Sequence, residues 1–237
     1  MRALPLYLVL ALTALPGPSP QAAPGCAQDA MLVFDGSGSM GELGHDPTTS
    51  TRIMEARRAV REAMPDIAPY RRVGLLSYGP GGTSACDGIT LHFAPRVDAG
   101  AAVVAGLDAL APGGLTPLAD SVAAAAQTLR GAGIVVLVTD GNETCGGTPC
   151  ALGARLAAER PGLTVHVIGF RVVYDPFSWN SPEADAYDGQ TVAKCLADAT
   201  GGLFVTTETV DELADALRIT LGCVVVGHAN ENRPGHL

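Results

Sequence analysis

The chain contains 237 residues, of which 47% are hydrophobic and 16% charged, and its formal net charge is −9. An acidic chain with a single lysine, Lys194, lacks the basic surface of a nucleic-acid-binding protein, so no nucleic-acid partner is expected. The length allows one sizeable domain or two small ones, and the negative charge suits a protein that attracts cations.

Residues 1–23 have the layout of a secretory signal peptide. Arg2 precedes an apolar stretch, residues 4–15, that is too short to span a bilayer comfortably, and a segment rich in Pro, Ser and Ala follows. We therefore expect a secreted or periplasmic protein with no membrane span after cleavage, and loss of Arg2 changes the formal charge from −9 to −10. An uncleaved membrane anchor is the alternative. Lipidation of Cys26 is disfavoured because the Ala-Pro pair shortly before it makes a weak lipidation site.

Six cysteines follow this segment, an even number that predicts disulfides in an oxidising compartment. They are Cys26, Cys86, Cys145, Cys150, Cys195 and Cys223. Because no second closely spaced cysteine pair could complete a zinc site, we expect Cys145 and Cys150 to form a local disulfide. Cys195 lies on the apolar face of a predicted helix, so a buried free thiol is its alternative. Spacing alone does not fix the connectivity.

Six strands are predicted, and most alternate with helices along the chain. They are Ala30–Phe34, Val73–Tyr78, Thr90–Phe93, Ile134–Thr139, Thr164–Phe170 and Leu203–Val205. The runs at 30–34 and 134–139 are almost continuously apolar, which is typical of strands covered on both faces of a parallel sheet. The segment at 90–93 follows 73–78 through a loop rich in Gly and Pro, which predicts an antiparallel hairpin at a sheet edge.

Four helices are predicted from apolar spacing and from their end signals. The first helix contains Ile53 and is expected to stop at Pro65. The second has Thr116 as its N-cap and Pro117 in its first turn. The third covers residues 192–199, and the fourth starts at a capping box, residues 209–212.

This order of elements predicts a doubly wound α/β domain. We expect a mostly parallel central sheet with one antiparallel edge strand and helices on both faces, spanning residues 24–226, followed by a polar tail at 227–237. In such a fold, ligands bind at the carboxyl ends of the strands.

The loop after the first strand has the spacing of a dinucleotide-binding turn, with Gly36, Gly38 and Gly41 in a G-x-G-x-x-G pattern. That turn normally leads directly into a helix whose N-terminus meets a pyrophosphate. Residues 42–51 contain a proline and no helical pattern, and Glu55 falls inside a helix where a ribose-binding acid should end a strand. A phosphate site is therefore disfavoured.

Oxygen-bearing side chains instead gather where strands end. Asp35, Ser37 and Ser39 follow the first strand, Asp140 follows the strand at 134–139, and Thr116 lies at a loop-to-helix junction between them. Each has a simpler explanation by itself, as loop, turn or N-cap residue. Their shared position at one sheet edge favours a site for Mg²⁺, or for Mn²⁺ or Ca²⁺, which prefer hard oxygen ligands.

The segments DGSGSM, GGLTPL and TDGNETC together resemble the metal-ion-dependent adhesion site of von Willebrand factor type A domains, as found in secreted bacterial proteins. The resemblance implies a Mg²⁺ bound directly by Ser37, Ser39 and Thr116, with Asp35 and Asp140 bound directly or through water. An Asp or Glu of a partner protein would fill the sixth position. It also implies that the domain ends are tied by a disulfide, which Cys26 and Cys223 would form.

The expected function is therefore adhesion-type protein binding rather than catalysis. One alternative is a metal-dependent hydrolase, against which the sequence shows no base near the motif except His45 and no G-x-S-x-G nucleophile turn. Another is a structural envelope domain that the metal stabilises.

Overall fold

The computed structural model describes residues 26–43, 50–81, 84–172, 183 and 193–223. The predicted signal peptide and C-terminal tail lie outside this part, as do His45 and residues 173–182 and 184–192. The elements are β1 (Asp29–Asp35), η2 (Gly38–Gly41), α1 (Arg52–Ile67), β2 (Val73–Tyr78), β3 (Ile89–Arg96), α2 (Gly100–Asp108), α3 (Leu118–Thr128), β4 (Gly133–Thr139), α4 (Pro149–Glu159), β5 (Leu163–Phe170), α5 (Lys194–Thr200), β6 (Phe204–Thr207) and α6 (Val210–Leu221). No helix in the described part is long and apolar enough to cross a membrane.

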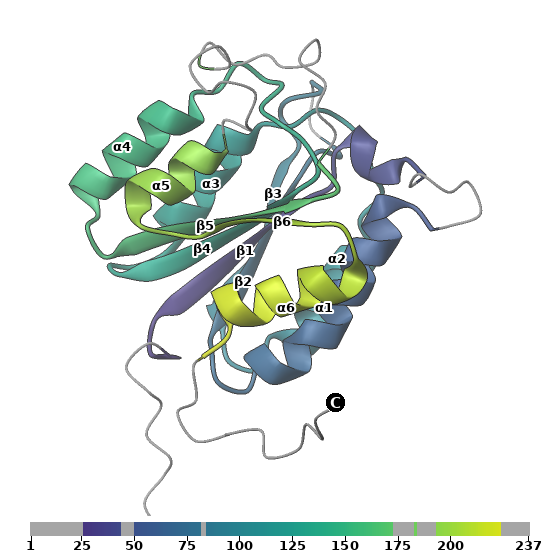
Figure 1. Ribbon diagram of the computed structural model, residues 1–237, viewed down its shortest axis with the longest axis horizontal. Coiled ribbons are helices and arrows are strands. Elements are labelled where there is room, and N and C mark those ends of the chain that lie inside the picture. Colours follow the sequence, from purple (N-terminus) through teal and green to yellow (C-terminus); the bar gives the residue numbers. More distant parts are fainter. Residues whose placement is uncertain (1–25, 44–49, 82–83, 173–182, 184–192, 224–237) are drawn as a thin grey trace, which may run out of the picture.

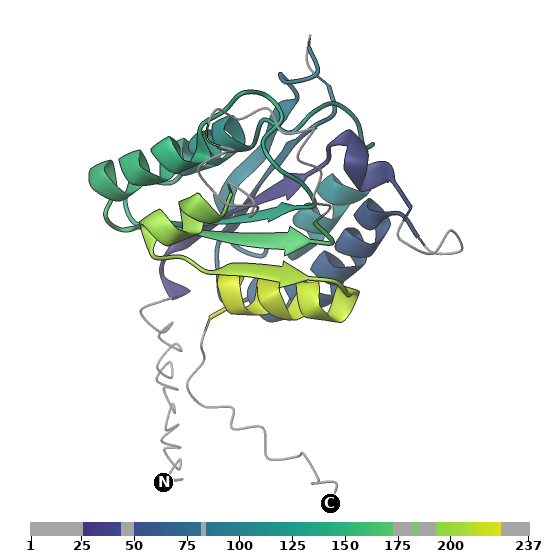
Figure 2. The same cartoon turned by 45° about the horizontal axis from the view of Figure 1, so that its top comes forward.

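The strands form one sheet in the order β3-β2-β1-β4-β5-β6. β3 runs antiparallel to β2, and the other neighbours are parallel. Helices α1, α2 and α6 cover one face, and α3, α4 and α5 cover the other (Figures 1 and 2). The predicted doubly wound fold with one antiparallel edge strand is confirmed.

β1 is buried on both faces, which explains its continuous apolar sequence. Leu32 and Phe34 belong to the core beneath α1, α2 and α6, whereas Met31 and Val33 belong to the core beneath α3, α4 and α5. β1 also pairs in parallel with β4, with Phe34 opposite Val138. Consequently the residues that follow these two strands emerge side by side at the carboxyl edge of the sheet.

Two predicted helix ends are wrong. α1 continues past Pro65 to Ile67, because Ile67 is fully buried and its packing keeps the last turn helical. α3 begins at Leu118 with Pro117 as its N-cap residue, so Thr116 lies outside the helix and is not its cap. The capping box at Thr209 is confirmed, since the side chains and backbone N–H groups of Thr209 and Glu212 bond reciprocally.

Helices α2 and α4 were not predicted. The sequence of α2, GAAVVAGLD, consists mainly of small apolar residues without a polar face, so it carries little helical periodicity. α4 did carry a signal, because Pro149 stands in its first turn and Leu152 and Leu156 share one buried face.

The described chain contains three disulfides and no free cysteine. They join Cys26 to Cys223, Cys86 to Cys145, and Cys150 to Cys195. The first is the pairing that the family resemblance implied. The local pairing of Cys145 with Cys150 and the free thiol at Cys195 are both wrong. Cys150 lies in α4, which packs against α5 and its Cys195, while Cys145 lies before α4 and meets the loop between β2 and β3.

Candidate metal centre

Asp35, the last residue of β1, is fully buried and held by three donors. Its Oδ2 accepts hydrogen bonds from the hydroxyl of Tyr78 at 2.8 Å and from Thr139 Oγ1 at 2.7 Å. Its Oδ1 accepts the backbone N–H of Ser37 at 2.8 Å. These bonds fix the carboxylate and also turn the following loop back over the strand end.

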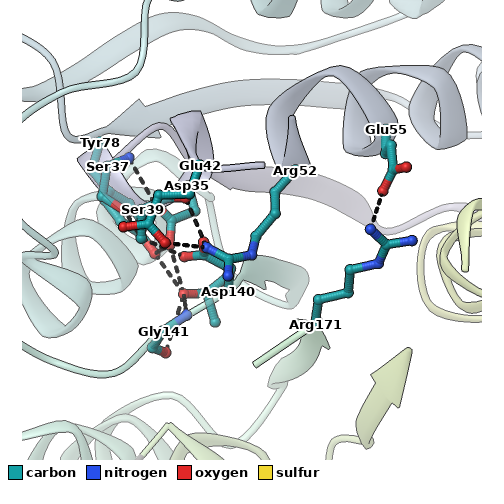
Figure 3. Close-up of polar contacts among 11 residues, drawn as sticks. Asp35, Ser37, Ser39, Glu42, Arg52, Glu55, Tyr78, Asp140, Gly141 and Arg171 are labelled. Carbon is teal, nitrogen blue, oxygen red and sulfur yellow. Dashed lines mark hydrogen bonds and ion pairs between the residues drawn. The ribbon is translucent and has the colours of Figure 1, made fainter. Parts of the chain in front are cut away.

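The two serines of the loop and Asp140 form a row of oxygen atoms. Ser37 Oγ lies 3.0 Å from Ser39 Oγ, and Ser39 Oγ donates to Asp140 Oδ1 at 2.8 Å. Figure 3 shows these side chains pointing toward one another beside Asp35. Ser37 and Asp140 are buried, whereas Ser39 is partly exposed. The row therefore opens toward solvent on the side of Ser39.

Thr116 reaches the same edge through a loop that is hydrogen-bonded on both sides. On one side, Gly38 N–H donates to Gly114 O at 3.2 Å and Gly113 N–H donates to Gly36 O at 2.9 Å. On the other, Thr116 N–H donates to Thr144 Oγ1 at 2.8 Å, and Thr144 N–H donates to Thr116 O at 3.2 Å. This loop thus lies between the serine loop and the segment that follows Asp140, and all five predicted ligands are brought to one edge.

Gly114 makes the close packing of this loop possible. Its φ is +71°, and a Cβ there would lie 1.9 Å from the carbonyl oxygen of Gly79. A residue with a side chain would be strained in this conformation and would also collide with the backbone of the neighbouring loop.

Arg52 supplies a cation at the rim. Its Nη1 donates to Ser39 O at 2.9 Å, to Glu42 Oε2 at 3.1 Å and to Asp140 Oδ2 at 3.3 Å. The guanidinium is buried and the Glu42 carboxylate is exposed. The loop that contains the serines is therefore fastened to the first turn of α1.

Sequence reasoning missed the residues that support the predicted ligands. Tyr78 and Thr139 each end a predicted strand beside Asp35, so their positions could have indicated a role. Arg52 carries no such signal, because the loop between Glu42 and Arg52 has no pattern that sets its path.

The centre carries more negative charge than its surroundings neutralise. Burial, and next the negative charge of Asp35, raise the pKa of Asp140 to about 7, although Ser39 and Arg52 act in the opposite direction. Burial and Asp35 also hold the pKa of Tyr78 well above its ordinary value. A bound divalent cation would relieve this repulsion between carboxylates.

The spacing of three of these oxygen atoms is compatible with an ion of the size of Mg²⁺. Octahedral Mg²⁺ binds oxygen at about 2.1 Å, which places neighbouring ligand oxygens about 3 Å apart. The Ser37–Ser39 and Ser39–Asp140 oxygen distances are 3.0 and 2.8 Å. Within the described residues no cluster of three or more His, Cys, Asp and Glu could hold a metal, so an ion at this edge would depend on hydroxyl ligands.

Comparison with known proteins gives one family model and several relatives. The model of the von Willebrand factor type A domain matches residues 30–143, a segment that contains all five candidate ligands. The uncharacterized protein YwmD of Bacillus subtilis is 27% identical over 198 residues, which cover 78% of this chain and 81% of YwmD.

Solved structures share the fold at low identity. The minor pilin PilB of Streptococcus sanguinis superposes with a TM-score of 0.59 at 14% identity, over 90% of this chain and 65% of PilB. Proximal thread matrix protein 1 from the mussel byssus, described with a zinc-occupied MIDAS motif, superposes with a TM-score of 0.52 at 18% identity, over 83% of this chain and 46% of that protein. MIDAS denotes the metal-ion-dependent adhesion site.

Proposed function

We propose that this chain, whose fold is that of a von Willebrand factor type A domain, is an exported protein-binding module with a divalent cation at its centre. Mg²⁺ would be held by Ser37, Ser39 and Thr116, with Asp35 and Asp140 bound directly or through water. A carboxylate of a partner protein would complete the coordination. Three disulfides support a location in an oxidising compartment.

The observation that carries this proposal is the contact between Ser39 and Asp140 at the carboxyl ends of β1 and β4. Oxygen atoms from loops 101 residues apart lie at the spacing of adjacent octahedral ligands. Asp35 already accepts three hydrogen bonds, so its part would be mainly to hold the serine loop through Ser37 and to balance the charge of the ion.

The chemistry of the ligands favours binding over bond cleavage. Three neutral hydroxyls leave much of the positive charge of Mg²⁺ available to an incoming carboxylate. None of the described residues that contact Asp35, Ser39 or Asp140 is a histidine that could activate a water molecule. The fold shared with a pilin and with a byssus protein that carries a MIDAS motif supports an adhesive role.

A peptide-display selection tests the proposal. The oxidised protein would be screened in Mg²⁺ and in EDTA, with Thr116→Ala as the matched variant. We expect peptides that bind only with Mg²⁺, that lose binding when one acidic residue is changed to its amide, and that do not bind the variant. Metal-dependent cleavage of the peptides would favour a hydrolase instead, and stabilisation by Mg²⁺ without any Mg²⁺-dependent peptide would favour a structural domain.

A further inference from the structure

We propose that the Cys86–Cys145 disulfide and Thr144 are a positioning device for Thr116, so that cation affinity depends on this disulfide and not on the other two. The inference rests on the proposed metal site and goes beyond it, because neither cysteine nor Thr144 belongs to the predicted ligand set.

Leu115 and Thr116 belong to a closed ring of hydrogen bonds and covalent bonds. Leu115 N–H donates to Ala85 O at 2.8 Å, and Ala85 immediately precedes Cys86. Thr116 exchanges two hydrogen bonds with Thr144, which immediately precedes Cys145. The disulfide joins the two outer segments with a Cα–Cα distance of 5.8 Å. The disulfide keeps the two segments that bond Leu115 and Thr116 at a fixed separation, so the loop of Thr116 moves away from the Asp140 segment only if these hydrogen bonds break.

Both ends of the disulfide are themselves held in place. Cys86 lies within a tight turn, in which Asp87 N–H donates to Ser84 O at 3.3 Å and Ser84 Oγ donates to Asp87 Oδ1 at 2.6 Å. On the other side, Cys145 N–H donates to Glu143 Oε1 at 2.8 Å. The other oxygen of this buried carboxylate accepts Ala119 N–H, in the first turn of α3, at 2.9 Å. Glu143 thus takes the capping role that Thr116 does not perform and anchors the helix that follows the Thr116 loop.

The other disulfides lie elsewhere in the fold and provide internal controls. Cys150–Cys195 links α4 to α5, and Cys26–Cys223 ties the start of β1 to the end of α6. Neither disulfide joins residues of the ring that contains Leu115 and Thr116, and Cys150 N–H donates to Glu183 Oε2 at 2.7 Å. Removing Cys150–Cys195 should therefore lower stability without changing the geometry at Thr116.

The test compares two double variants, Cys86→Ser with Cys145→Ser and Cys150→Ser with Cys195→Ser. Each would be titrated calorimetrically with Mg²⁺, and amide hydrogen exchange would be measured in EDTA. We expect the first variant to bind Mg²⁺ about 10-fold or more weakly, as for other groups that orient metal ligands, and to exchange faster at Thr116 and Thr144 without metal. The second should keep the wild-type affinity. Wild-type affinity in both variants, or an equal loss of affinity in both, would overturn the inference.

Thr144 offers a second test that leaves every disulfide intact. Thr144→Val removes the hydroxyl that accepts Thr116 N–H, whereas Thr144→Ser retains it. We expect weaker Mg²⁺ binding in the first variant and near-normal binding in the second, and wild-type affinity in Thr144→Val would contradict the role of this residue. A wild-type protein that binds no Mg²⁺ would instead overturn the proposed metal site, and the positioning role would fall with it.

Discussion

Ser39 Oγ donates a hydrogen bond of 2.8 Å to Oδ1 of Asp140, a residue 101 positions further along the chain. The two residues follow β1 and β4, which are neighbouring parallel strands in the middle of the sheet. This contact directly joins the serine loop to the distant aspartate, and the proposed ion would lie beside it.

Replacing Ser39 by alanine should weaken cation binding more than it weakens the fold. The change removes one of three proposed hydroxyl ligands, so we expect the Mg²⁺ affinity to fall at least about 10-fold. Ser39 is only partly buried, and the free energy of unfolding without metal should change by about 1 kcal/mol. Calorimetric titration beside Thr128→Ala, which removes a hydroxyl on α3 that donates to Ala124 O, checks this. Equal affinities in the two variants would contradict the assignment of Ser39.

Tyr78→Phe should destabilise the protein by removing one donor to the buried Asp35 carboxylate. A hydrogen bond to a charged group contributes about 1.5–3 kcal/mol to stability, and we expect a loss in this range. Tyr70 provides the matched control, because it is 55% exposed and its replacement by Phe should cost less than about 0.5 kcal/mol. Urea unfolding of both variants gives the two free energies. A similar small cost for each would mean that the Tyr78 hydroxyl does not support Asp35.

Gly114→Ala should lower the free energy of unfolding by more than the cost of placing an alanine at a positive φ. Gly131 has a similar φ of +81° but open space around its Cβ position, so Gly131→Ala measures the conformational penalty, about 1–2 kcal/mol. A Cβ at Gly114 would also collide with Gly79 O, and we expect a total loss of at least about 3 kcal/mol, together with weaker Mg²⁺ binding. Equal costs for the two variants would show that the loops are not packed this closely.

The raised pKa of Asp140 predicts a pH-dependent stability in the metal-free protein. The folded state holds a proton on this carboxyl up to about pH 7, whereas the unfolded value is near 3.8. The folded state therefore binds more protons than the unfolded state between these values, and the free energy of unfolding falls as the pH rises through this interval.

Urea unfolding in EDTA across this interval, with Asp140→Asn as the control, measures the effect. The asparagine variant should lack this component of the pH dependence. Mg²⁺ should bind more tightly as the pH rises toward 7 and should release protons on binding. If the free energy of unfolding changes by the same amount in the wild type and in Asp140→Asn over this range, the raised pKa is contradicted.

The sheet could be predicted from sequence because its strands carry strong local patterns. The central residues of β1 and β4 are almost continuously apolar, since both faces of each strand are buried. The predicted range of β2, Val73–Tyr78, agrees with the structure. The placement of Asp35, the two serines and Asp140 followed from their positions at strand ends, given that β1 and β4 are neighbours.

The disulfides and the supporting residues could not be predicted in the same way. Pairing depends on which loops and helices meet in space, and the short spacing between Cys145 and Cys150 favoured a local ring that the packing of α4 against α5 rules out. Arg52 contacts Asp140 across 88 residues, and no local pattern indicates this contact. The N-cap expected at Thr116 failed because the distant carboxylate of Glu143 accepts the first-turn N–H of α3.

The central claim is that a divalent cation lies where the serine loop, the Thr116 loop and Asp140 meet. The most direct measurement is a crystal structure of the oxidised protein soaked in Mn²⁺, with anomalous difference maps recorded at the manganese edge. The account predicts one strong peak within coordination distance of the hydroxyls of Ser37, Ser39 and Thr116. A map with no peak at this edge, or with its only peak elsewhere on the protein, would contradict it.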